Sequence, residues 1–109
     1  MNTELIPRPQ DRIICLKVGK IRRNNLYEMT RKFWKIKLER AVQATHVLAV
    51  SEGEVVAVYL PKAWEYTKDP RYLGRVEFVG TELHQSDYIG KNVSDYYGRS
   101  SNPVKYINM

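Results

Sequence analysis

Two short apolar runs on either side of a glycine-containing turn constrain the fold of this chain more than any other feature. His-Val-Leu-Ala-Val-Ser at 46–51 and Val-Val-Ala-Val-Tyr-Leu at 55–60 are separated by Glu-Gly-Glu. Short runs rich in β-branched residues are typical of buried strands, and the glycine suits a tight turn. The pattern predicts a β-hairpin with both strands largely buried, and we expect Pro61 to end the second strand.

A helical pattern precedes the hairpin. Apolar residues recur from Leu26 at the three- and four-residue spacing of a helix, and Asn25 and Glu28 match the reciprocal capping pattern at a helix start. The pattern fits one helix that continues to Gln43. It fits equally well two shorter helices with a break near residues 34–37.

Three further runs, at 12–18, 75–79 and 104–107, have the composition of strands. Gly80 is expected to stop the second, and a short helix is expected at 93–97. The order of strand, one or two helices, hairpin, strand, irregular segment and short strand indicates an α+β fold. We expect a small, mostly antiparallel sheet or barrel with one or two helices packed against it.

Length and composition indicate one domain. The chain has 109 residues, of which 43% are hydrophobic and 28% charged, as is ordinary for a globular protein. We expect residues 1–10 to form an extended N-terminal arm and residues 11–109 a single α+β domain. No apolar run approaches the roughly 20 residues that span a bilayer, and the start does not resemble a signal peptide. The expected location is the cytoplasm, without a membrane partner.

The residues that support catalysis or metal binding are sparse. Cys15 lies in an apolar run, which favours a buried side chain over a reactive thiol, and His46 and His84 are far apart without other ligands at metal-binding spacing. No nucleophile, phosphate-loop or dinucleotide motif is present. We therefore expect no catalytic residues, no metal and no cofactor, and predict a protein that is not an enzyme.

Positive charge is concentrated in the first part of the chain. The net charge is +6, but residues 8–40 carry eleven Lys or Arg against three acids, while residues 41–109 carry seven against eight. Such an asymmetry is typical of a face that binds a polyanion, although a cationic surface that serves solubility has the same composition. DNA or RNA is the favoured partner, and an acidic protein surface is the alternative.

Recognition of an unstacked base requires flat aromatic side chains, cations for the phosphates and an amide for the base edge. The sequence offers candidates for each role, together with two further residues, Tyr97 and Arg99, in the expected loops near the C-terminus. The stacking candidates are Trp34, Trp64 and Tyr66, the phosphate-binding candidates are Arg22, Arg23, Arg31, Lys35 and Lys91, and the amide candidates are Asn92 and Asn102.

Several short motifs resemble a family of small bacterial and phage proteins. They are Leu-Tyr-Glu-Met-Thr-Arg-Lys-Phe-Trp-Lys at 26–35, Tyr-Ile-Gly-Lys at 88–91 and Asn-Pro-Val-Lys-Tyr-Ile-Asn at 102–108. The resemblance covers residues 26–108 and implies a self-contained module. The layout of strands, helix and aromatic loops is also similar to the PUA-like group, which includes ASCH, EVE and YTH modules. That likeness implies binding of RNA, or of DNA with modified bases, in an aromatic pocket.

Two functional hypotheses follow. The first is a nucleic-acid-binding module that recognises an unstacked or modified base beside a basic face. The second is a phage-type interaction or inhibitor module that binds an anionic surface of a host or defence protein. Aromatic and arginine residues serve protein interfaces as well as nucleic-acid sites, so both hypotheses stay open.

Overall fold

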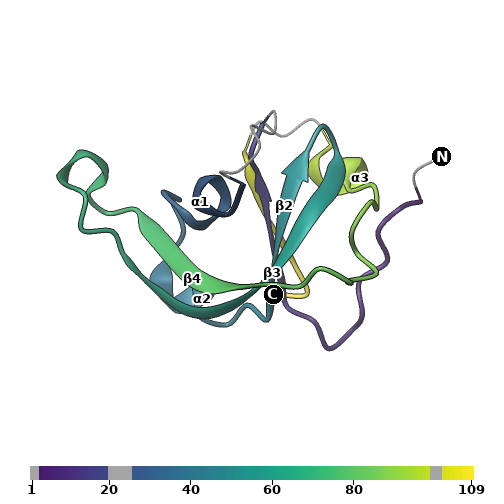
Figure 1. Cartoon of the computed structure of the whole chain (residues 1–109), viewed down its shortest axis with the longest axis horizontal. Coiled ribbons are helices and arrows are strands. Elements are labelled where there is room, and N and C mark those ends of the chain that lie inside the picture. The colour runs from purple at the N-terminus through teal and green to yellow at the C-terminus, as the bar shows by residue number, and fades with distance from the viewer. Residues whose placement is uncertain (1–2, 20–25, 99–101) are drawn as a thin grey trace.

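A five-stranded mixed sheet organises the chain in the computed structural model, which describes residues 3–19, 26–98 and 102–109 (Figure 1). The strands are β1 (Ile13–Lys17), β2 (His46–Ser51), β3 (Glu54–Tyr66), β4 (Val76–Glu82) and β5 (Val104–Ile107). Their order in the sheet is β4-β3-β2-β1-β5. β1 and β2 are parallel, and the other three pairings are antiparallel. The predicted α+β class and the predicted hairpin at 46–60 are confirmed, and the described strands form an open sheet.

The helical region forms two short helices, α1 (Leu26–Arg31) and α2 (Leu38–Ala41). Between them the backbone of Trp34 pairs with Val76: the Trp34 N–H donates to the Val76 carbonyl at 3.0 Å, and the Val76 N–H donates to the Trp34 carbonyl at 2.9 Å. A peptide group bonded to a strand edge cannot also continue the helical ladder. The second of the two alternatives, a break, is therefore correct. The expected cap at Asn25 lies outside the described residues.

The central strands are buried on both faces, because side chains alternate across the sheet. Ile14, Leu16, Val47 and Ala49 belong to the hydrophobic cluster on one face. Their neighbours along β1 and β2 belong to the cluster on the other face, and include Ile13, Cys15, Leu48 and Val50. These eight side chains are all 0% exposed. A sheet of this kind requires a covering layer on each side.

The layers that cover the two faces of the sheet differ in secondary structure. α1, α2 and the segment between them cover the first face, whereas α3 (Ser94–Tyr97) lies on the other side of β2 and β3 (Figure 1). The rest of the second layer is irregular and includes the N-terminal arm. The Leu5 N–H donates to the Asn92 carbonyl at 2.8 Å, the Asn92 N–H donates to the Thr3 carbonyl at 2.7 Å, and Leu5 is only 2% exposed. The arm is thus extended and packed against the domain.

Two predicted strand ends are wrong. β3 continues through Pro61 to Tyr66, and β4 continues through Gly80 to Glu82. The pairing register shifts between Pro61 and Ala63, and Gly80 lies opposite Pro61. A β-carbon at Gly80 would collide with the Leu60 carbonyl and lie 2.9 Å from the Cα of Pro61. Glycine therefore permits the close approach at this irregularity, and the β3–β4 ribbon extends away from the rest of the sheet (Figure 1).

The outer edge of β4 is covered by groups from α1 and the segment that follows it. Besides the Trp34 pairing, the Arg31 Nε donates to the Phe78 carbonyl at 2.9 Å, and the Gly80 N–H donates to the Tyr27 hydroxyl at 3.0 Å. These contacts satisfy backbone groups at alternate positions of an edge strand. They also fix the position of α1 against the ribbon.

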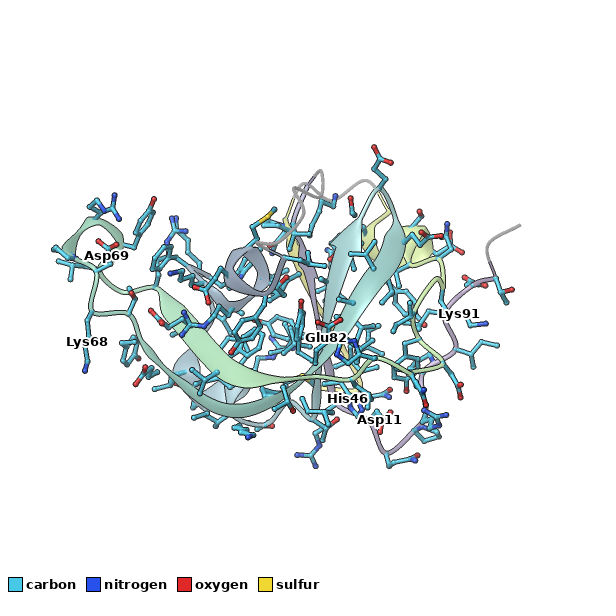
Figure 2. All side chains as sticks on the ribbon, in the orientation of Figure 1. Asp11, His46, Lys68, Asp69, Glu82 and Lys91 are labelled. Carbon is cyan, nitrogen blue, oxygen red and sulfur yellow. The ribbon has the colours of Figure 1, made fainter. Side chains whose placement is uncertain are left out.

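A buried carboxylate joins the N-terminal arm to the second covering layer. Asp11 is 7% exposed, and the Tyr88 hydroxyl donates to its Oδ2 at 2.6 Å. The same hydroxyl accepts the Arg8 N–H at 2.9 Å. Figure 2 shows His46 close to Asp11, and its Nδ1 lies 3.9 Å from the carboxylate. Asn108 donates to the Asp11 carbonyl at 2.9 Å, so the C-terminus is tied to the same point.

We expect Tyr88→Phe to lower the free energy of unfolding by about 1–3 kcal/mol, because it leaves a buried carboxylate and a backbone N–H without their shared partner. Urea unfolding followed by circular dichroism measures the change. Tyr66→Phe is the matched control, since Tyr66 is 56% exposed and should change stability by less than about 0.5 kcal/mol. Equal midpoints for Tyr88→Phe and wild type would contradict this role for the hydroxyl.

Candidate nucleic-acid interface

A cavity of about 190 Å³ lies between the segment that follows α1, the residue before β4 and the start of β5. We call it the Trp34 cavity. Its lining combines aromatic, cationic, amide and aliphatic side chains from three separate parts of the chain. The lining residues are Phe33, Trp34, Lys35, Arg75, Asn102, Pro103 and Val104.

The wall at residues 33–35 is held firmly. Both the N–H and the carbonyl of Trp34 are hydrogen-bonded to Val76, and the indole Nε1 donates to the Thr30 carbonyl at 2.7 Å. The Phe33 ring stacks on Tyr72 with 4.2 Å between centroids and 7° between planes. The half-buried Trp34 ring therefore keeps a fixed orientation at the cavity, which limits the entropy lost when a ligand stacks there.

The opposite wall is fixed through the turn that precedes β5. The Asn102 Oδ1 accepts the Val104 N–H at 3.0 Å, and the Pro103 carbonyl accepts the Lys17 N–H at 2.9 Å. The Tyr97 hydroxyl donates to the same carbonyl at 3.2 Å. Asn102 is exposed and lines the cavity.

Two cations complete the cavity. Lys35 is exposed, while Arg75 is half-buried and donates from Nη1 to the Phe33 carbonyl at 3.2 Å. Pockets for drug-sized ligands usually measure about 300–1,000 Å³, so the Trp34 cavity suits one planar group better than a large cofactor. The arrangement can therefore stack a ring and attract an anion beside it.

The structure brings three of the predicted site residues together here: Trp34, Lys35 and Asn102. Sequence reasoning missed Arg75, which it included in the expected strand at 75–79. Arg75 reaches the cavity because it directly precedes Val76, which pairs with Trp34. That pairing cannot be predicted from the sequence, so the sequence carries no signal for Arg75.

Trp64 does not line the Trp34 cavity. β3 continues past Pro61, so Trp64 lies opposite Phe78 and faces the first hydrophobic cluster. The two ring centroids are 5.0 Å apart, and Trp64 is 8% exposed. Its position is that of a core residue, where a ligand does not reach its face. Tyr66, two residues further along β3, is 56% exposed on the ribbon.

Arg31 is engaged within the protein. Its Nη2 lies 2.8 Å from Glu77, its Nη1 lies 3.3 Å from Glu28, and its Nε donates to the Phe78 carbonyl. The side chain is 13% exposed. These bonds hold the guanidinium against the edge of β4, so Arg31 serves the fold rather than an external phosphate.

Three other predicted residues lie with the second hydrophobic cluster, on the opposite face of the sheet. Tyr97 is 6% exposed, and burial raises the pKa of its hydroxyl. Asn92 accepts the Ser94 N–H at 2.9 Å through its Oδ1. Lys91 lies well away from α1 (Figure 2) and lines a second cavity of about 170 Å³ with Arg8 and Asp87. None of the three lines the Trp34 cavity, and Tyr97 contacts its wall through the hydrogen bond to the Pro103 carbonyl. Arg22, Arg23 and Arg99 lie outside the described residues.

Other kinds of site find little support among the residues that the structure describes. They contain no group of three or more His, Cys, Asp or Glu side chains placed to hold a metal ion. Burial raises the pKa of the Cys15 thiol to about 12. None of the described helices has the length and apolar character needed to cross a bilayer.

We expect Cys15 to resist alkylation in the folded protein. At pH 8 a thiol pKa of about 12 leaves roughly a thousandfold less thiolate than the usual value of about 8.5, and burial also blocks access. Iodoacetamide labelling followed by mass spectrometry should show complete reaction in urea and almost none in buffer. Rapid labelling without denaturant would contradict the buried position of this side chain.

We compared the chain with protein-family models, with curated proteins and with solved structures, and none of the three comparisons finds a match.

Proposed function

We propose that the protein is a nucleic-acid-binding module that holds one unstacked base in the Trp34 cavity. The observation that carries this proposal is the meeting of Trp34, Lys35, Arg75 and Asn102 around one open cavity. Stacking on an aromatic ring, phosphate contact by a cation and an amide at the base edge are the elements of single-strand recognition.

The charge around the cavity supports the same function. Residues 32–41 contain Lys32, Lys35, Lys37 and Arg40 but only one acid, Glu39. Lys35, Lys37 and Arg40 are exposed. Cations that neutralise phosphates supply most of the sequence-independent affinity for a polynucleotide. Selection of a modified base would fit the small cavity, which holds a single ring system.

A second candidate function is protein binding through the β3–β4 ribbon. Leu73 is 78% exposed and Tyr72 37% exposed at its tip, and Tyr66 and Val79 are also exposed along it. Apolar side chains that gather on a protruding segment are typical of protein contact sites. This function would be favoured if a protein co-purifies in stoichiometric amount after nuclease treatment, and if the Leu73→Asp variant no longer binds that protein.

The decisive test measures the affinity of labelled 12-nucleotide single strands of DNA and RNA by fluorescence anisotropy. We expect Trp34→Ala to weaken binding by about 1–3 kcal/mol through the lost stack. Because Trp34 also contacts Thr30, Lys35→Ala provides a variant with little risk to folding. It should lower the slope of log affinity against log salt by about 0.7, as expected when one phosphate contact to a single strand is lost.

Lys91→Ala is the matched control, since it removes the same charge on the opposite face of the sheet. It should leave the affinity and the salt slope nearly unchanged. In a Trp64→Phe background Trp34 is the only tryptophan, so quenching of tryptophan fluorescence reports on the cavity. The change breaks no side-chain hydrogen bond within the described structure, because the Trp64 Nε1 has no partner there. No binding at low salt, or equal losses from Lys35→Ala and Lys91→Ala, would contradict the proposal.

A further inference from the structure

We propose that the Trp34 cavity is one end of a longer path for a single-stranded polynucleotide, and that the Arg40–Tyr106 pair provides its second stacking position. This inference rests on the proposed function and adds a separate site to it. The Arg40 guanidinium carbon lies 3.6 Å from the centroid of the Tyr106 ring. Tyr106 is half-buried and Arg40 is exposed.

The two walls of the cavity continue directly to this pair. Val104 lines the cavity, and Tyr106 follows two positions later on β5. Alternate residues of a strand share a face and lie about 7 Å apart, so Tyr106 stands one step beyond Val104 on the same side of the sheet. On the other wall, the chain runs from Lys35 through Lys37 to Arg40 in α2. Both walls thus lead from the first aromatic position to the second.

Arg40 differs from the arginines that serve the fold. Arg8, Arg31 and Arg71 each contact a carboxylate. Arg40 forms no ion pair with any residue that the structure describes, and its guanidinium lies over the face of Tyr106. An arginine stacked on a ring keeps its N–H groups in the plane of the guanidinium, where they remain able to donate to a phosphate.

The chemistry at both ends matches a polynucleotide. Bases stack on aromatic rings and on guanidinium planes alike, and lysines between the stacks contact the connecting phosphates. Trp34 supplies the first stack, the exposed Lys37 lies between the two positions along the chain, and Arg40 on Tyr106 supplies the second. A mononucleotide reaches one end of such a path, whereas a strand of several nucleotides reaches both.

A length series tests the path. The probes are oligo(dT) and oligo(U) of two, four, six and eight nucleotides, with dissociation constants measured by competition against a labelled strand. We expect wild-type affinity to rise from two to four or six nucleotides and then level off. Arg40→Ala should remove this rise, weakening binding of the hexamer about tenfold while changing the dimer less than about twofold. Tyr106→Phe keeps the ring and should bind as wild type, and Lys91→Ala is the control for loss of charge.

The outcomes separate the two proposals. If wild type binds but Arg40→Ala retains the full gain with length, the second position is wrong and the cavity stands. If Arg40→Ala weakens the dimer and the hexamer equally, Arg40 belongs to the cavity and the path is overturned. If neither wild type nor variants bind any oligomer at low salt, both the path and the proposed function fail. A stronger gain with oligo(U) than with oligo(dT) would assign the path to RNA.

Discussion

β1 has neither a free edge nor an exposed apolar face, and the rest of the structure is arranged to meet that constraint. It pairs with β2 on one side and β5 on the other, and four of its five residues are 0% exposed. Its parallel partner requires a crossover, which supplies α1 and α2 to one face. On the other face the described part of the chain places α3, and the arm and the loop around Tyr88 complete its cover. The N-terminal arm and the loop around Tyr88 therefore have a structural role, because they help to cover this face of the sheet.

Hydrophobic pattern predicted the elements whose position depends on local sequence. The hairpin at 46–60, the strands at β1 and β5, and the short helix at α3 all follow from runs and turns. The strand ends at Pro61 and Gly80 could not be predicted, because a bulge on one strand and a missing β-carbon on the other act together across the ribbon. The break between the helices could not be decided from the sequence either, because it depends on the pairing of Trp34 with Val76, which is far away in the sequence.

The candidate site shows the same division. Residue type identified Trp34, Lys35 and Asn102, which do meet, but also Trp64, Tyr97 and Arg31, which the fold uses for packing and ion pairing. An aromatic ring or a guanidinium has similar neighbours in sequence whether it faces a ligand or the core. Tyr97 differs by lying on the other face of the sheet, Arg31 by the carboxylates within its reach, and Trp64 by its burial in the first hydrophobic cluster. These three properties depend on pairing between distant parts of the chain.

The covered edge of β4 has a consequence for how the molecule meets other chains. At Val76, Phe78 and Gly80, outward backbone groups are taken by Trp34, Arg31 and Tyr27. A strand from a second molecule would have to displace three separate contacts to extend the sheet there. The protruding ribbon can therefore expose side chains such as Tyr66 and Leu73 while the outer edge of β4 is closed to strand addition.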